Sequence, residues 1–305
     1  MHPDRESPSR TDRHRILHLS DPHLTRAGID EDGVDGTAAL ERILHDARFV
    51  PGIDLVVLSG DIADDGSPEG YAAVLERVGR FAAERQIPHV YCTGNHDDRA
   101  TFAAVLGSGH VGADGTDVGR LAPDAGDLRV AVSEVVGLRV ITLDSLVPGS
   151  VDGFVGDGQL AWLRSLLDQP APAGSVVVVH HAPIALDSAA LMRSVNLQNA
   201  SDLADTVSGT DVRAVLCGHF HLQLSGSLDG VPVWVTPGVV TRIDLTTPWH
   251  LARAVKGAGA TVVDLGGPGS PMFHVLQARD PEAGAQVYLV DAVSGEDVAT
   301  APDRS

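Results

Sequence analysis

The sequence predicts an α/β protein in which two mixed β-sheets, flanked by helices, form a four-layer sandwich. Strand-like and helix-like patterns alternate up to residue 94, which is typical of βαβ units with a largely parallel sheet. Two later stretches, 128–145 and 222–238, each read as neighbouring strands joined by a tight turn. They predict a second sheet with antiparallel pairing.

The helices are expected where apolar residues recur with helical spacing. Ser67 and Pro68 form a typical start signal, an N-cap followed by proline at the first helical position. Leu75, Val78 and Phe81 then fall on one face of that helix. The five predicted helices are 37–48, 68–86, 98–107, 157–168 and 199–208.

Turn signals and composition organise the rest of the chain. Asp229-Gly230 marks the tight turn of the second strand pair. The stretch 255–270, rich in glycine, is expected to be a flexible loop near the site or a linker to the last strands. Those strands, 272–279 and 285–292, are expected to form a hairpin.

The main domain is expected to span 14–245. It follows a disordered segment, 1–13, and precedes an extension, 246–305, whose strands complete or cap the same domain.

Composition narrows the class of protein. The net charge of −19 and the lack of a Lys/Arg-rich run argue against nucleic acid as a partner and against an anionic membrane surface. No hydrophobic leader or membrane span is visible, so we expect a cytoplasmic protein. Cys92 and Cys217 lie in apolar runs and are expected to be buried thiols. The sequence does not decide whether the protein forms a homodimer.

Metal-ligand residue types follow five apolar runs. The runs are HRILHLS, DLVVLSG, PHVYCTG, SVVVV and VRAVLC. The segments that follow or close them are Asp21-Pro22-His23, Gly60-Asp61, Gly94-Asn95-His96-Asp97, His180-His181 and Gly218-His219-Phe220-His221. Each segment alone is a weak signal, since turns and caps use the same residues. Buried strands that end at one rim of a sheet bring such residues together, so the set predicts two metal ions.

The ligand types are coherent with that prediction. One carboxylate must bridge two cations about 3.5–4 Å apart, and Asp61 is the candidate. Asn95 offers a neutral amide oxygen, and the histidines offer imidazole nitrogens. Mixed nitrogen and oxygen ligands suit Mn, Fe, Zn or Co better than Mg or Ca. The expected chemistry is hydrolysis of a phosphate ester, with a bridging hydroxide as the nucleophile.

These motifs resemble those of the calcineurin-like metallophosphoesterase superfamily. Longer stretches resemble the bacterial class III 3′,5′-cyclic nucleotide phosphodiesterases: LHLSDPHL, SGDIADDG, GNHDDR, VVHHAP, GTDVRAVLCGHFH and DGVPVWVTPG. The resemblance covers about 14–245 and implies a two-sheet metallophosphatase fold for that catalytic domain. It also implies two divalent or trivalent ions, drawn from Fe, Mn and Zn.

The resemblance implies a division of the ligands between two metals. One metal would be held by Asp21, His23, Asp61 and His221. The other would be held by Asp61, Asn95, His180 and His219, with His180 preferred to His181 because the first histidine of this motif is usually the ligand.

Residues beside the ligands have open roles. His96 is expected to protonate the leaving group or to bind phosphate, or else to be a packed histidine. Asp64 matches the family position that orients this histidine, and it would raise the pKa of the imidazole. Asp65 and Asp97 are expected in caps or turns. Arg99 is expected to contact phosphate or to be a solvated helix residue.

The expected function is hydrolysis of 3′,5′-cyclic AMP or GMP to the 5′-nucleotide. The alternatives are a broader metallophosphoesterase that acts on glycerophosphodiesters or nucleotide phosphates, and a non-catalytic scaffold of the same fold. Loops 108–127 and 186–198 are the expected source of residues that grip the base or sugar.

Overall fold

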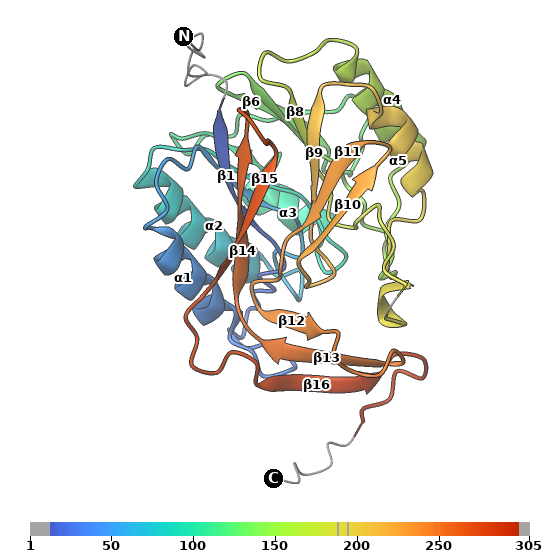
Figure 1. Cartoon of the computed structure of the whole chain (residues 1–305). Helices are drawn as coiled ribbons and strands as arrows, with labels where there is room; N and C mark the ends of the chain where they lie inside the picture. Colours follow the sequence, from blue (N-terminus) through green and yellow to red (C-terminus); the bar gives the residue numbers. More distant parts are fainter. Residues whose placement is uncertain (1–12, 188, 194, 299–305) are drawn as a thin grey trace, which may run out of the picture.

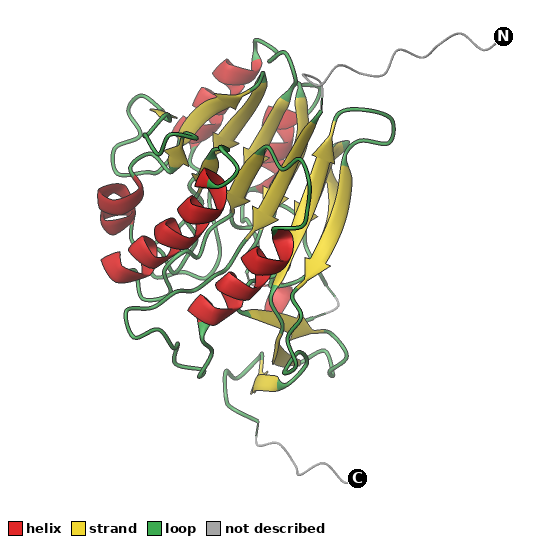
Figure 2. Ribbon diagram, turned by 90° about the vertical axis from the view of Figure 1, so that its left-hand side faces the viewer, coloured by secondary structure: helices red, strands yellow, loops and turns green. Residues whose placement is uncertain are grey.

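Two β-sheets lie face to face in the computed structural model of the protein, which describes residues 13–187, 189–193 and 195–298 (Figure 1). Helices cover the outer faces of both sheets, which confirms the predicted α/β sandwich (Figure 2). The predicted disordered segment 1–13 falls on residues 1–12, which lie outside the described residues, and on Arg13.

The first sheet has six strands in the order β15-β14-β1-β2-β3-β4. Strands β1, β2 and β3 are parallel, as the alternating pattern predicts, and the other pairs are antiparallel. The bounds are β1 (His14–Leu19), β2 (Leu55–Leu58), β3 (His89–Tyr91), β4 (His110–Val111), β14 (Gly259–Leu265) and β15 (Met272–Gln277).

The second sheet has seven strands in the order β10-β11-β9-β8-β7-β6-β5. Both predicted strand pairs are present, β6 with β7 and β10 with β11. Asp229 and Gly230 join the second pair with positive φ angles of 46° and 87°, as a two-residue hairpin turn requires. The bounds are β5 (Arg120–Leu121), β6 (Ala131–Val135), β7 (Leu138–Thr142), β8 (Ser175–Val178), β9 (Val212–Cys217), β10 (Leu224–Leu228) and β11 (Val231–Val235).

All five predicted helices are present, within a few residues of their expected bounds. Ser67 caps the second helix by accepting a hydrogen bond from the Gly70 N–H. Three helices pack on the first sheet and two on the second. They are α1 (Gly36–Ala47), α2 (Pro68–Ala83), α3 (Arg99–Leu106), α4 (Asp157–Leu167) and α5 (Ala200–Val207).

Strands β2 and β8 are buried at every position because both faces of their sheets are covered. One face of each sheet packs against helices, and the other packs against the opposite sheet. Val57 of β2 and Val178 of β8 are among the residues that fill the space between the sheets. The two cysteines, Cys92 and Cys217, are buried free thiols, as predicted. No helix in the described part of the chain is long and apolar enough to cross a membrane.

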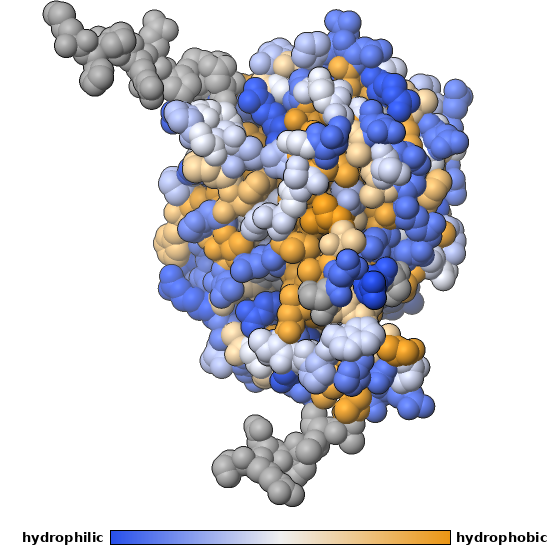
Figure 3. Space-filling model, turned by 45° about the vertical axis from the view of Figure 1, so that its right-hand side comes forward, coloured by the Kyte–Doolittle hydropathy of each residue, from blue (hydrophilic) through white to orange (hydrophobic). Residues whose placement is uncertain are grey.

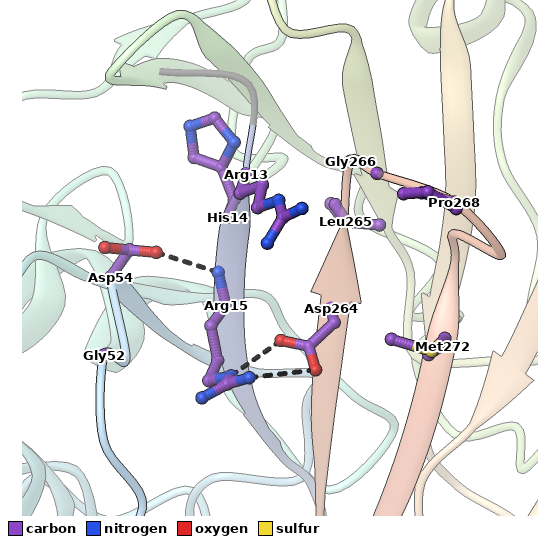
Figure 4. A pocket seen from close by; sticks show the side chains of 11 residues that line it. Arg13, His14, Arg15, Gly52, Asp54, Asp264, Leu265, Gly266, Pro268 and Met272 are labelled. Carbon is purple, nitrogen blue, oxygen red and sulfur yellow. Dashed lines mark hydrogen bonds and ion pairs between the residues drawn. The ribbon is translucent and has the colours of Figure 1, made fainter. Parts of the chain in front are cut away.

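The sequence predicted a loop or linker in the glycine-rich stretch 255–270, and this prediction is wrong. The central part of the stretch is β14, which pairs antiparallel with β1 in the middle of the first sheet. Gly259 at the start of β14 allows close approach to Pro237, because a Cβ atom there would lie 2.6 Å from the proline ring. Arg15 of β1 reinforces the pairing through its guanidinium, which bonds Asp264 at 2.6 and 3.1 Å (Figure 4).

The predicted hairpin of the last two strands is also wrong. Strand β15 pairs with β14 in the first sheet, whereas β16 (Gln286–Asp291) belongs to a third sheet. That sheet has the order β12-β13-β16, with β12 (Thr241–Asp244) and β13 (Leu251–Lys256). It lies below the sandwich in Figure 1. We propose that the strands after residue 245 form one domain with residues 14–245.

Aromatic residues join the two sheets at one edge of the sandwich. Trp234 of β11 stacks on Phe273 of β15, with ring centroids 4.7 Å apart, and its Nε1–H donates to Thr261 of β14 at 2.9 Å. Phe273 is half-buried and Met272 beside it is 51% exposed.

On the face shown in Figure 3, an apolar band runs down the middle and hydrophilic surface borders it.

Two buried histidines make the fold sensitive to acid. Burial lowers the pKa of His89 to about 4 and that of His110 to about 3. Histidine in the unfolded chain titrates near 6.5, so between about pH 6.5 and pH 4 the unfolded state binds more protons. Stability should therefore fall as the pH falls through this window, by up to about 1.4 kcal/mol per pH unit for each histidine. Urea unfolding at pH 7.5, 5.5 and 4.5 measures the slope.

The variant His110→Gln should show a shallower slope, because one group that takes up a proton on unfolding is gone. His45 is exposed on α1, so His45→Gln should keep the slope of the parent. Equal slopes in all three proteins would show that His110 is not held neutral in the fold.

Candidate metal centre

The loops that carry the predicted ligands meet at the carboxyl ends of strands β1, β2, β3, β8 and β9. Backbone hydrogen bonds extend the β1–β2 pairing beyond the strands, from Asp21 N–H to Gly60 O and from His23 N–H to Asp61 O, both 3.1 Å. The Gly218 N–H donates to His180 O at 3.0 Å and joins the β8 and β9 loops. The structure thus brings all seven predicted ligands into one region, as parallel strands that end together predict.

Most of these residues adopt a backbone conformation that side chains disfavour. Five of the seven have positive φ angles: Asp21 (54°), His23 (44°), Asp61 (49°), His219 (71°) and His221 (48°). Non-glycine residues are uncommon in this region of backbone space, and they cluster at functional sites. The turns that hold the ligands are therefore set by the surrounding hydrogen bonds rather than by local preference.

Asp21, His23 and His221 form one group of potential ligands. The Nε2 atoms of the two histidines are 3.3 Å apart, and Asp21 Oδ1 lies 3.4 Å from His221 Nε2. The Nδ1 atom of His221 lies 2.7 Å from the Thr241 hydroxyl. This contact occupies Nδ1, and Nε2 is left to face the other donors.

A second group lies around His180. Its Nε2 atom is 3.1 Å from His219 Nδ1 and 3.2 Å from Asn95 Oδ1. Its Nδ1–H donates to the Ser59 carbonyl at 2.7 Å, so Nε2 carries the free lone pair. His181 places Nδ1 2.7 Å from the Ser145 hydroxyl, its Nε2 has no hydrogen-bond partner among the described residues, and it is close enough to His180 and His219 to share an ion with them. The choice of His180 over His181 as the ligand therefore stays a prediction.

Asp61 lies between the two groups. Its Oδ2 atom is 3.2 Å from His180 Nε2 and 3.6 Å from His23 Nε2, and its Oδ1 atom accepts the His96 backbone N–H at 2.9 Å. Gly94 makes this arrangement possible, because a Cβ atom there would lie 2.2 Å from Asp61 Oδ1. One carboxylate thus faces both sets of donors.

The donor set fits metal ions. The carboxylates of Asp21 and Asp61 are buried, at 0% and 2% exposure, and no Lys or Arg pairs with either within the described residues. Buried charges in proteins are paired or bind metals. Among the described residues, the His and Asp side chains close enough to share an ion include the triads Asp21–His23–His221 and Asp21–Asp61–His180.

His96 and Asp64 lie beside the predicted ligands. Asp64 Oδ1 is 3.0 Å from His96 Nδ1 and also 2.7 Å from His23 Nδ1, so this carboxylate touches a predicted ligand as well as the histidine that it was predicted to orient. Burial alone would lower the pKa of His96, but the hydrogen bond with Asp64 and the charge of Asp61 raise it to about 10. The imidazole therefore favours its protonated form.

Arg99 is not a solvated helix residue. Its guanidinium forms a two-point ion pair with the buried Asp144, at 2.8 and 2.9 Å. Asp97 closes a turn, as expected, since its N–H donates to Gly94 O at 3.3 Å. Its carboxylate is also buried and accepts hydrogen bonds from Gly94, Ile62 and Ala63 at 2.7 to 3.1 Å, a role that was not predicted. The signal in the sequence that could have indicated this role is the position of Asp97 directly after Gly-Asn-His. Asp65 is a turn residue, as predicted.

Replacing Asp97 by alanine should disrupt the two loops that carry Asp61 and Asn95. Three backbone N–H groups would lose their acceptor, and each unsatisfied buried group costs about 1–3 kcal/mol. We expect a loss of at least about 3 kcal/mol in the free energy of unfolding, together with weaker metal retention after dialysis. Urea unfolding and elemental analysis measure the two effects.

Asp98 offers a matched control, because it is exposed and caps α3 through the Thr101 N–H at 2.8 Å. Asp98→Ala should cost only about 1 kcal/mol, as for other helix caps, and should leave metal retention unchanged. If both variants behave alike, the role given to Asp97 is wrong.

A hollow of about 270 Å³ opens over the predicted ligands. His23, Asp61, Asn95, His219 and His221 line it together with His96. The remaining wall is mostly apolar and comes from five parts of the chain: Val151; Leu191, Met192 and Val195; Phe220; Ile243; and Tyr288. Of the two loops expected to grip the substrate, 186–198 lines the hollow, but no described residue of 108–127 does.

Comparison with known proteins identifies the family. The model of the calcineurin-like phosphoesterase family matches residues 14–223, more than half of the chain. The protein belongs to this family. It is therefore a metal-dependent phosphoesterase, and the strand-end motifs recognised in the sequence are those of a calcineurin-like enzyme.

Curated relatives include bacterial phosphodiesterases. A protein of Rhodococcus erythropolis named as a probable cyclic nucleotide phosphodiesterase is 39% identical over 250 residues, which is 81% of this chain and 77% of that protein. A cAMP/cGMP dual specificity phosphodiesterase of Mycobacterium tuberculosis is 35% identical, over 80% of this chain and 73% of its own. A glycerophosphodiester phosphodiesterase of Enterobacter lignolyticus is 28% identical, over 68% and 70%.

A solved structure supports the fold. A dimetal phosphatase from Danio rerio superposes with a TM-score of 0.56 over 87% of this chain and 98% of its own, at 14% sequence identity. At this identity the likeness concerns the arrangement of the strands and helices alone.

Proposed function

We propose that the protein hydrolyses a 3′,5′-cyclic nucleotide, cyclic AMP or cyclic GMP, to the 5′-nucleotide at a centre of two metal ions. The observation that carries this proposal is the position of Asp61, whose Oδ2 atom lies 3.6 Å from His23 Nε2 and 3.2 Å from His180 Nε2. The similarity to relatives named as cyclic nucleotide phosphodiesterases supports the substrate class.

In this proposal each metal has its own ligands and shares one. Asp21, His23 and His221 would hold the first ion, Asn95, His180 and His219 would hold the second, and Asp61 would serve both. Imidazole nitrogens mixed with carboxylate and amide oxygens suit Mn, Fe or Zn. The chemistry that the metals supply when bound is activation of water and neutralisation of the charge on the phosphate.

His96 is the proposed general acid. Asp64 holds its Nδ1 atom, which leaves Nε2 available on a side chain that lines the hollow. The ribose oxygen that leaves a cyclic nucleotide is a poor leaving group and needs a proton as its bond to phosphorus breaks. Asp64 stabilises the imidazolium that donates this proton, and the His96 backbone N–H orients Asp61 at the same time.

A substrate panel tests the proposal. The Mn-loaded enzyme is assayed with cyclic AMP, cyclic GMP, glycerophosphodiesters, phosphomonoesters and bis(p-nitrophenyl) phosphate. We expect the highest kcat/KM among the natural substrates for a cyclic nucleotide. A higher value for a glycerophosphodiester, or no hydrolysis of cyclic nucleotides by an enzyme active on the aryl ester, contradicts the proposed substrate. A metal-loaded protein inactive on every ester would be a non-catalytic scaffold.

A further inference from the structure

The hollow over the predicted metal centre has two chemically different sides, and Tyr288 lies between them. On one side the wall is apolar, with Met192 and Ile243 buried to 2% and 7% exposure. On the other side a neighbouring hollow of about 200 Å³ is lined by Asp64, His96 and the acidic run 30–32. Tyr288 contributes to the wall of both. This side chain is therefore placed where the organic part of a substrate would lie.

The third sheet fixes the position of Tyr288. Its backbone is opposite Ala254 in the β13–β16 pair, and Ala254 is fully buried. The Tyr288 side chain packs partly against the core of the second sheet. Burial and the nearby Asp32 raise the pKa of Tyr288 to about 12, so the phenol is neutral near pH 7. A ring held by a sheet in this way is preorganised for contact with a flat group.

No described residue that lines either hollow is Lys or Arg. A second phosphate on the substrate would find no Lys or Arg side chain, and the acidic run 30–32 lies on the side of the hollow that Tyr288 borders. The walls thus suit a molecule whose single phosphate sits at the metals and whose other part is uncharged. An aromatic ring with aliphatic neighbours is the wall that a nucleobase prefers, because every base has a face that stacks.

We propose that Tyr288, with Ile243 and Met192, forms a subsite for the nucleobase of a substrate that carries one phosphate. This inference rests on the proposed function and adds to it a specificity-determining residue from a part of the chain that carries none of the family motifs. The subsite acts on binding of the organic group and takes no part in the reaction at phosphorus.

The test compares substrates that differ only in the base. The values of kcat and KM are measured for cyclic AMP and for methyl ribofuranoside 3′,5′-cyclic phosphate, which has the same cyclic phosphate but no base. The variants are Tyr288→Leu, which keeps apolar volume but removes the ring, and Tyr288→Phe, which keeps the ring. Val293→Ala is the matched control, because Val293 follows the same strand, is 72% exposed and does not line the hollow.

We expect weaker binding only of the substrate that carries a base. Tyr288→Leu should raise KM for cyclic AMP about tenfold with kcat little changed, in keeping with the usual effect of removing an aromatic ring that stacks on a base. Neither constant should change for the substrate without a base. Tyr288→Phe and Val293→Ala should resemble the parent. An equal loss on both substrates, or none on either, overturns the subsite.

A binding measurement separates failure of this inference from failure of the proposed function. Adenosine 5′-monophosphate and ribose 5-phosphate are compared as inhibitors of aryl diester hydrolysis. The parent should bind the nucleotide about tenfold more tightly, and Tyr288→Leu should lose that preference. This holds even if cyclic nucleotides are not hydrolysed. Equal inhibition of the parent by the two compounds overturns the subsite independently of the substrate panel.

Discussion

Replacing Asp61 by alanine should abolish hydrolysis and lower the content of both metal ions. The reason is geometric, because Asp61 Oδ2 lies 3.6 Å from His23 Nε2 and 3.2 Å from His180 Nε2, closer to both than Asp21 Oδ1 at 4.0 and 3.9 Å. Loss of metal chemistry removes several kcal/mol of transition-state stabilisation, so kcat/KM should fall on the order of 10³-fold or more. Assays with cyclic AMP and elemental analysis of the purified variant measure both effects.

Two further variants sharpen this prediction. Asn95→Ala should lower occupancy of the His180 group while leaving that of the His221 group nearly intact, since the amide oxygen lies 3.2 Å from His180 Nε2. Asp65→Ala is the control, because this exposed carboxylate accepts hydrogen bonds from Arg26 and Ser67, neither of which is a predicted ligand. Full occupancy of either group with near-normal turnover in Asp61→Ala would rule out the shared carboxylate.

Replacing His96 by alanine should slow cyclic nucleotide hydrolysis far more than aryl ester hydrolysis. A nitrophenolate leaves without help, whereas a ribose alkoxide needs a proton. General acid catalysis contributes about 10²–10⁴-fold, so we expect a loss of at least about 10²-fold with cyclic AMP and less than about tenfold with bis(p-nitrophenyl) phosphate. Alanine keeps the backbone N–H that orients Asp61, so metal content should be nearly unchanged.

Asp64→Asn tests the partner of His96. This variant should show the same substrate-dependent loss of rate as His96→Ala, but a smaller one. Because Asp64 also bonds His23 at 2.7 Å, the variant should in addition retain less metal. It is therefore a less selective probe than His96→Ala. If His96→Ala slows both esters equally, the side chain binds phosphate or supports the ligands, and the general-acid role is wrong.

The helices, the parallel strands and the convergence of the motifs could be predicted because their signals are local. The run LVVL before Asp61 is apolar at every position, which indicates a strand covered on both faces, and its carboxyl end fixes where Asp61 lies. The strand 259–265 was missed because Gly259 and Ala260 resemble a loop until Pro237 and β15 are seen against them.

The misassigned side chains depend on partners distant in sequence. Arg99 looked free until the buried Asp144 was in place, and the acceptor role of the Asp97 carboxylate depends on the backbone of Ile62 and Ala63. Tyr288 belongs to none of the family motifs. It reaches the hollow only because β16 joins a third sheet instead of pairing with β15.

The position of β14 has a consequence for how the protein is made. Strand β1 lies between β2 and β14, and His14 is opposite Leu265, so β1 leaves the ribosome long before the strand with which it pairs. Until residue 265 has emerged, an apolar strand edge stays open to pairing with other chains. Pairings between such distant segments also slow folding. A gene shortened to the part that matches the family, 14–223, would lack this strand and should yield aggregated protein although every predicted ligand is present.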